Sequence, residues 1–176
     1  MIAYVDTSSL IKLYVDEAGA DTVRNLVREA SIVATSAATN VEMRASLAAW
    51  RRDRRLTPSA YTSTRKAFVS DWEGIVAIEV SADVIRTAGD LAERHQLRTL
   101  DAIHLASFVQ ILERAETEEV RFSSFDDRLN RAARRLGARD APCRLSLNGF
   151  RSAHRSAARS PRPRNGDAVG LQLRRA

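Results

Sequence analysis

The stretch LRTLDAIHLASFVQIL, residues 97–112, decides which fold the chain is expected to have. Apolar side chains occur almost all the way round the helix that it predicts, and a helix without a wide polar face has to be buried on several sides. Its first turn nevertheless carries one carboxylate, Asp101, with His104 three residues later. A buried carboxylate is unfavourable unless something pairs with it. Asp101 is therefore the first candidate for a functional residue.

Short strand-like segments alternate with helical segments on both sides of this stretch. We expect a mainly parallel sheet in an α/β sandwich, because this alternation is typical of one. In such sheets, ligands bind outside the carboxyl ends of the strands. The expected strands cover 2–5, 31–34, 75–80, 120–123 and 143–147, and the expected helices cover 10–15, 20–30, 38–54, 58–71, 82–95, 99–112 and 126 or 127–136.

The composition is ordinary for a soluble globular domain, with 44% hydrophobic and 28% charged residues in a chain of 176. We expect no transmembrane segment, because the most apolar run is too short to cross a bilayer. The N-terminal MIAYVD lacks the basic region of a signal peptide. With Cys143 as its one cysteine, the chain can form no internal disulfide. These features predict a reducing, cytoplasmic setting.

The net charge of +6 belongs to the end of the chain. Residues 150–176 contain seven arginines and one aspartate, whereas residues 1–149 contain 21 basic and 21 acidic residues. We place a domain at 1–147 and predict that the Arg/Ser/Pro-rich tail at 148–176 is disordered, because its composition cannot bury enough apolar surface. The tail is an RNA-affinity extension, an artefact or the product of a frame change, and its composition does not choose among these.

Several acidic residues have a local explanation. Asp6 ends the first strand and could cap the next helix or form an Asx-turn. Glu42 follows Thr39 by three residues, which is the spacing of a capping box. Asp101 follows Thr99, the expected N-cap, and an acid in a first turn complements the helix dipole. Taken singly, these residues need no function.

The joint placement of the acids favours a site. Asp6 and Asp126 follow expected strands, Glu42 begins the helix after the second strand, and Asp127 is the rival of Asp126 as helix cap. Clustered carboxylates need a counter-charge, and oxygen ligands suit Mg²⁺ or Mn²⁺. The sequence contains no zinc-type His/Cys cluster, no GxxxxGK[ST] loop and no GxSxG elbow.

Four stretches resemble PIN-domain ribonucleases, specifically the VapC-type toxins of bacterial VapBC toxin–antitoxin systems. They occur in the order and spacing of that family and together cover about residues 1–140. They are YVDTSSLIKLY at 4–14, TNVEMRASLA at 39–48, LRTLDAIHLASF at 97–108 and FSSFDDRLNRAARRLG at 122–137. The resemblance implies a three-layer α/β/α PIN fold and a Mg²⁺- or Mn²⁺-dependent endoribonuclease that leaves a 5′-phosphate.

The resemblance also implies roles for the acids. Asp6, Glu42 and Asp101 match the three core acids of the family, and Asp126 matches the fourth, more variable one. Asp6 and Asp101 are expected to be the main metal ligands, while Glu42 and Asp126 complete the cluster or orient water. The implied partners are a VapB-type antitoxin, a tRNA or rRNA substrate and a second copy of the chain in a homodimer.

Polar residues next to the acids are expected to support them. Thr7, Ser8 and Ser124 are candidates for holding the acids or contacting phosphate, because hydroxyl groups suit both tasks. His104 lies on nearly the same helix face as Asp101. A hydrogen-bonded core histidine is the favoured interpretation, with a general base as the alternative.

Three other functions are alternatives to a metal-dependent ribonuclease. A phosphoacceptor receiver-like domain would need a lysine near the last strand, and the only lysines are Lys12 and Lys66. A non-catalytic PIN-like module that binds RNA or a protein partner is the main alternative. A nuclease directed at DNA would differ only in its substrate.

Overall fold

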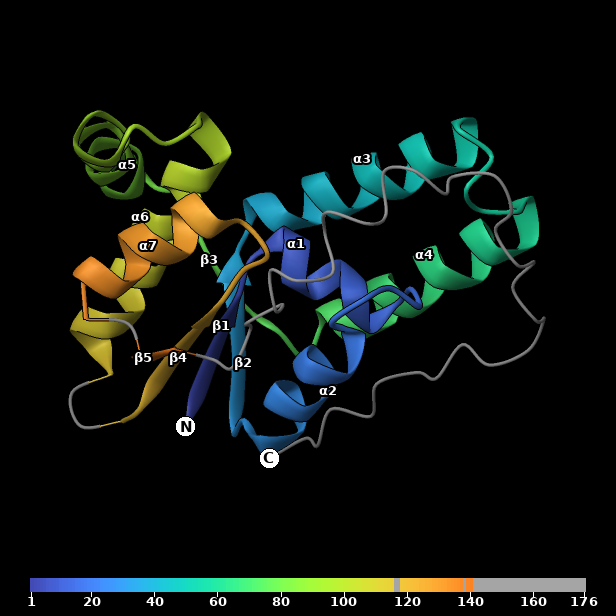
Figure 1. Cartoon of the computed structure of the whole chain (residues 1–176), viewed down its shortest axis with the longest axis horizontal. Helices are drawn as coiled ribbons and strands as arrows, with labels where there is room; N and C mark the ends of the chain where they lie inside the picture. The colour runs from blue at the N-terminus through green and yellow to red at the C-terminus, as the bar shows by residue number, and fades with distance from the viewer. Residues whose placement is uncertain (116–117, 138, 141–176) are drawn as a thin grey trace, which may run out of the picture.

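The described residues of the computed structural model, 1–115, 118–137 and 139–140, form a five-stranded sheet with helices on both faces (Figure 1). The strand order is β3-β2-β1-β4-β5, and every pair is parallel. The first strand in the sequence, β1, is thus central in the sheet and is flanked by β2 and β4. The strands are β1 (Ile2–Val5), β2 (Ile32–Ser36), β3 (Val76–Ile78), β4 (Val120–Ser123) and β5 (Arg139–Asp140).

The two faces of β1 belong to two separate cores. Ile2 and Tyr4 pack with one layer of helices, whereas Ala3 and Val5 pack with the other. This alternation follows from the two-residue repeat of a strand whose faces are both covered. One layer contains α5 (Ala82–His95), α6 (Thr99–Arg114) and α7 (Asp127–Arg135), and the other contains α1 (Thr7–Leu10), the 3₁₀ helix η1 (Ile11–Leu13), α2 (Ala20–Glu29), α3 (Ala38–Arg52) and α4 (Pro58–Trp72). The expected α/β/α sandwich is confirmed.

Helix α6 is buried as its sequence predicts. Its buried residues point in several directions and include Leu105, Ala106 and Phe108, which have no exposed surface. Phe108 packs edge-on against Phe122 of β4, with ring centroids 4.9 Å apart, and Phe122 stacks on Tyr4 at 5.4 Å. These contacts fix α6 against the middle of the sheet.

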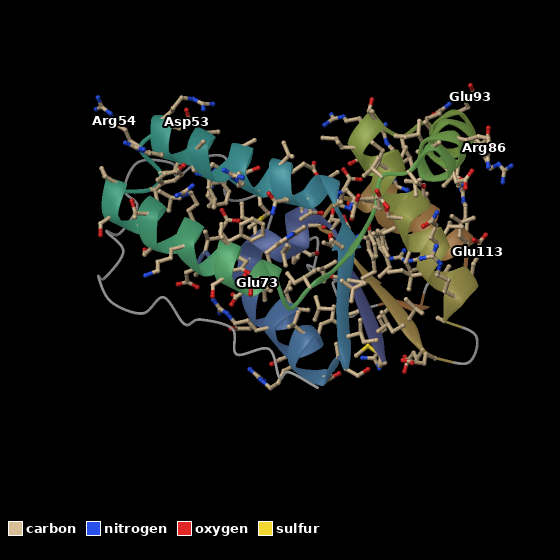
Figure 2. The ribbon with its side chains drawn as sticks, turned by 180° about the vertical axis from the view of Figure 1, so that it is seen from behind. Asp53, Arg54, Glu73, Arg86, Glu93 and Glu113 are labelled. Carbon is tan, nitrogen blue, oxygen red and sulfur yellow. The ribbon has the colours of Figure 1, made fainter. Side chains whose placement is uncertain are left out.

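The helix pair α3–α4 extends away from the sheet. Its turn contains Arg54 in the left-handed region (φ 58°), and Figure 2 shows Asp53 and Arg54 at the far end of α3, pointing away from the sheet. Thr57 caps α4 by accepting a hydrogen bond from the Ala60 amide, and Pro58 opens the helix as predicted.

Several predicted boundaries were wrong. The helix expected at 10–15 begins at Thr7 and continues as η1, and the strand expected at 75–80 is confined to Val76–Ile78. A short strand at Arg139–Asp140 was not predicted. The strand expected at 143–147, Cys143, the domain end at 147 and the tail at 148–176 lie outside the described residues. No described helix is long and apolar enough to cross a membrane.

Candidate active site

Asp6 lies at the carboxyl end of β1 and caps α1. Its Oδ1 accepts a hydrogen bond of 2.8 Å from the Ser9 amide, so the predicted capping role is confirmed. The Ser8 hydroxyl lies 2.8 and 2.9 Å from the two carboxylate oxygens, and the Ser124 hydroxyl donates to Oδ2 at 2.7 Å. Burial raises the pKa of Asp6, although His104 and these three donors oppose the change. The Asp6 side chain is therefore held in one orientation, and burial makes its charged form energetically unfavourable.

Ser124 connects Asp6 to the start of α7. Its hydroxyl oxygen accepts a hydrogen bond of 2.9 Å from the Asp126 amide while its proton is donated to Asp6. The Asp126 carboxylate caps α7 by accepting a 2.9 Å hydrogen bond from the Leu129 amide. Ser8 adds a second link between the two loops, because its hydroxyl oxygen accepts from the Phe125 amide at 2.8 Å. The predicted supporting roles of Ser8 and Ser124 agree with this geometry.

Asp101 is half-buried in the first turn of α6. Its pKa is raised by burial and by the charges of Asp126 and Asp6, with His104 and Arg98 opposing. The Asp101 carboxylate is therefore within electrostatic range of the carboxylates of Asp126 and Asp6, which belong to two other elements. Thr99, the expected N-cap, is inside the helix, and the capping position is occupied by Arg98, which makes no side-chain cap.

Of the two rival acids, Asp126 is the one whose charge acts on Asp101. Asp127, in the first turn of α7, is exposed like Asp126 but is not among the charges that act on Asp101. This difference supports Asp126 as the fourth acid of the cluster.

Glu42 forms a hydrogen-bonded chain with residues from three other elements, α1, α6 and β1. Its Oε2 accepts a 2.6 Å hydrogen bond from the Thr7 hydroxyl and lies 2.8 Å from Nε2 of His104. On the other side of the imidazole, Nδ1 lies 3.0 Å from the hydroxyl of Tyr4. Burial raises the pKa of Glu42, but the hydrogen bonds from His104 and Thr7 outweigh it and hold the pKa below its ordinary value. Glu42 is therefore ionised at neutral pH.

The capping box predicted for Glu42 was wrong. Helix α3 begins before Thr39, whose hydroxyl pairs instead with Thr35 at 2.7 Å. Glu42 is consequently free to reach across to Thr7 and His104, as the preceding distances show.

His104 is a hydrogen-bonded core residue, as the favoured interpretation predicted. It is 3% exposed, and each ring nitrogen has a partner. Sequence reasoning missed Tyr4, which is entirely buried. The pKa of Tyr4 is raised well above its ordinary value by burial, so its hydroxyl keeps its proton and can donate it to Nδ1. The signal available in the sequence was a hydroxyl group in an otherwise apolar strand.

The donor atoms of the cluster are of the kind that binds a hard cation, but the described side chains are not arranged as a complete metal site. Within the described part of the chain, no three His, Cys, Asp or Glu side chains are placed so that together they could hold a metal ion. The donors are nevertheless all carboxylate oxygens, and burial raises the pKa values of Asp6 and Asp101, so a nearby cation would favour their charged forms. Such donors suit Mg²⁺ or Mn²⁺.

Comparison with known proteins identifies the family. The PIN domain model matches residues 3–135. Ribonuclease VapC49 of Mycobacterium tuberculosis (strain ATCC 25618 / H37Rv) is 32% identical over 144 residues, which are 82% of this chain and 97% of that protein. Ribonuclease VapC46 of the same strain is 33% identical over 135 residues, or 76% of this chain and 92% of the relative.

A solved structure has the same fold. It is the crystal structure of Mycobacterium tuberculosis VapC20, described as a sarcin-ricin loop cleaving toxin. The TM-score is 0.53 at 23% sequence identity, and the match covers 74% of this chain and 94% of that one. The family model and the two ribonuclease relatives lead to one conclusion: the chain belongs to the PIN-domain family, in its VapC-type branch.

Proposed function

We propose that this chain is a metal-dependent endoribonuclease that acts as the toxin of a toxin–antitoxin pair. The observation that carries the proposal is the convergence of Asp6, Asp101 and Asp126 at the carboxyl edge of the sheet, where each of the other two raises the pKa of Asp101. Membership of a branch whose relatives are named ribonucleases supports the same reading.

In this proposal Asp6, Asp101 and Asp126 would hold the cation, directly or through water, and Glu42 would complete the cluster. When bound there, Mg²⁺ or Mn²⁺ would screen the charge of the phosphodiester and lower the pKa of a bound water molecule. Ser8, Ser124 and the Ser9 amide keep the Asp6 carboxylate in one orientation.

The chain contributes a fixed acceptor through Glu42. Thr7 and His104 both bond to Oε2, which holds the carboxylate ionised and in place. Glu42 could thus accept a hydrogen bond from the attacking water and orient it toward the phosphorus atom. His104 acts through Glu42 and not on the substrate, because both of its ring nitrogens are already bonded.

The test compares cleavage of RNA by matched carboxamide variants. Asp6→Asn and Asp101→Asn should each lower Mg²⁺- or Mn²⁺-dependent cleavage of total RNA by at least about 100-fold, as the loss of a charge in the reaction centre commonly does. The control is Asp83→Asn, because Asp83 also lies in a first helical turn but is exposed and paired with Arg86. Circular dichroism establishes that each variant is folded.

The outcomes separate the candidate functions. Cleavage retained by Asp6→Asn or Asp101→Asn would overturn the site assignment. Absence of cleavage by the unmodified chain with either ion, together with binding of RNA, would favour the non-catalytic module. A DNA substrate in a parallel reaction distinguishes a DNA nuclease.

The partners belong to the same proposal. VapC20 is described as cleaving the sarcin-ricin loop, so a structured RNA loop is a rational first substrate for this chain. A VapB-type antitoxin is the proposed inhibitor, and a homodimer is the proposed assembly. Induced expression should arrest growth, and co-expression of a small protein encoded next to this one should relieve the arrest.

A further inference from the structure

A basic pocket lies beside the carboxylate cluster, between the end of α5 and the exposed face of α7. Its volume is about 300 Å³, and it is lined by His95, Gln96, Arg128, Arg131, Ala132 and Arg135. Four of the six lining residues carry a guanidinium or an imidazole, and none carries a carboxylate. We call this set the α7 pocket.

The sequence of α7 puts its arginines on one side. Arg128, Arg131 and Arg135 are spaced by three and four residues, which places them along one face of the helix. Leu129 and Ala133 are buried on the other face, against the core. A rise of about 1.5 Å per residue spreads the three guanidinium groups over roughly 10 Å along the helix axis.

The positive charge of the pocket is not balanced within the described residues. Arg128, Arg131 and Arg135 are exposed, and none of them forms an ion pair with a described residue. Arg128 donates one hydrogen bond, of 2.9 Å, to the backbone oxygen of Gln96. The pocket therefore has donors available for an anion.

His95 also lacks a partner. Both of its ring nitrogens are shielded from solvent and have no hydrogen-bond partner among the described residues. Burial lowers the pKa of His95, and Arg135 and Arg94 lower it further. Arg86 and Glu93, on the same helix, point to the outside in Figure 2, so they do not fill the pocket. Buried polar atoms without partners are uncommon and call for a ligand or water.

The α7 pocket lies along the helix that one acid of the cluster, Asp126, caps. Asp126 caps α7, and Arg128 follows it by two residues. An RNA strand cut at the carboxylates has to continue past them, and the same carboxylates repel its phosphates. A row of guanidinium groups beside the acids would offset that repulsion and fix the strand, because their planar forks match phosphate oxygens.

We propose that the α7 pocket binds backbone phosphate of the RNA next to the scissile bond. The proposal rests on the nuclease function proposed above for the same site. It assigns the exposed Arg131 and Arg135 to substrate binding, with Arg128 placed between them and the acids and His95 in the wall of the pocket. An acidic protein segment is the competing occupant of the pocket, and the experiment distinguishes it from RNA.

The experiment measures RNA binding apart from cleavage. The full chain is titrated into a fluorescently labelled single-stranded RNA of mixed sequence in EDTA, and fluorescence anisotropy is read at several salt concentrations. The test variant is Arg131→Gln/Arg135→Gln. The control is Arg65→Gln/Lys66→Gln, which removes the same charge from exposed positions on α4, in the opposite helical layer.

The pocket variant should bind RNA at least about 10-fold more weakly than the control. Its plot of log affinity against log salt should be shallower by about 1.4, since each phosphate contact on a single strand contributes about 0.7. Arg131→Lys/Arg135→Lys keeps the charge and should recover most of the salt dependence but less of the affinity. Thermal unfolding of each variant checks the fold.

Three results would overturn the inference: unchanged RNA affinity in the pocket variant, an equal loss in the control, or a loss confined to a polyglutamate probe. The last result would assign the pocket to an acidic protein partner. If the pocket variant loses RNA affinity as expected while the unmodified chain cleaves no RNA with Mg²⁺ or Mn²⁺, the proposed function fails and the α7 pocket stands.

Discussion

Ser124→Ala removes the hydroxyl of the loop after β4 that donates directly to the Asp6 carboxylate. The hydroxyl is completely buried, donates to Asp6 Oδ2 at 2.7 Å and accepts from the Asp126 amide at 2.9 Å. The substitution therefore takes a donor from a buried carboxylate and an acceptor from a backbone amide. Ser8 and the Ser9 amide remain as donors to Asp6.

The magnitude follows from these two bonds. A hydrogen bond to a charged group contributes about 1.5–3 kcal/mol, and the amide of the half-buried loop can recover part of its loss from water. We expect the free energy of unfolding to fall by about 2–3 kcal/mol. Ser123→Ala is the matched control, because its hydroxyl is also buried but pairs at 2.9 Å with the neutral hydroxyl of Ser9. It should cost about 1 kcal/mol.

The pH dependence gives a second readout. Burial raises the pKa of Asp6 and the Ser124 hydroxyl lowers it, so the variant should have a still higher pKa at Asp6. If ionised Asp6 is required for cleavage, the acidic limb of the pH–rate profile should move to higher pH in Ser124→Ala and stay in place in Ser123→Ala.

Urea unfolding at pH 7 in EDTA measures the difference in stability. The rate of Mg²⁺-dependent cleavage from pH 5 to 8 gives the position of the acidic limb of the pH–rate profile. Equal stability losses in the two variants would refute the reasoning that the bond to the Asp6 carboxylate is the stronger one. An unshifted limb in Ser124→Ala would refute the link between this hydroxyl and the charge of Asp6.

Three further predictions concern other parts of the site. The pKa of Asp101 is raised by burial and by the charges of Asp126 and Asp6. Between the unfolded pKa of about 3.9 and the higher folded pKa, the folded state therefore binds more protons than the unfolded state. The free energy of unfolding falls as the pH rises through this range and stays lower above it. In urea unfolding without divalent ions, Asp101→Asn should thus be more stable than the unmodified chain at pH 7, by less than about 1 kcal/mol because Asp101 is half-exposed. Below pH 4 the two proteins should have equal stability. A variant that is less stable at pH 7 would contradict the repulsion. Gly19→Ala should cost about 2–4 kcal/mol by thermal unfolding, because Gly19 has a φ of 89° and a Cβ there would lie 2.5 Å from the Phe125 ring; a cost near zero would show that the ring moves freely. Tyr4→Phe removes the partner of His104 Nδ1 and should lower kcat for RNA cleavage more than it changes KM, whereas equal effects on both would indicate a structural role alone.

Much of the site could be predicted from the sequence because its residues stand where elements begin or end. Asp6 and Ser124 follow strands, and Asp126 and Asp101 lie at the start of helices. Parallel strands bring their carboxyl ends to one edge of the sheet, so position in the chain was enough to group Asp6, Ser124 and Asp126. It did not place Asp101 there, because α6 follows another helix, α5. The local capping interpretation of Asp6 and of Asp126 also holds in the structure.

The interpretation of Glu42 failed for a definite reason. The three-residue spacing from Thr39 to Glu42 fits a capping box, but α3 begins one residue before Thr39, and Thr39 bonds to Thr35 inside the core. A helix start is poorly defined by sequence when no residue at the start caps it, and Ala37 makes no side-chain cap. The same weakness misplaced the cap of α6 at Thr99.

The sequence by itself determined the alternation of strands and helices along the chain, the burial of residues 97–112 and the placement of Asp6, Glu42 and Asp126 at one sheet edge. These depend on local periodicity and on where strands end. The tertiary structure alone decided that His104 bridges Tyr4 and Glu42, which are 100 and 62 residues away, and that α7 and the end of α5 enclose a basic pocket. Such contacts depend on how α6 packs against the sheet and on which face α7 buries, and no local pattern encodes the distance between two packed elements. Asp101 began as an unexplained charge on an apolar helix, and the packing of that helix places it beside two other carboxylates.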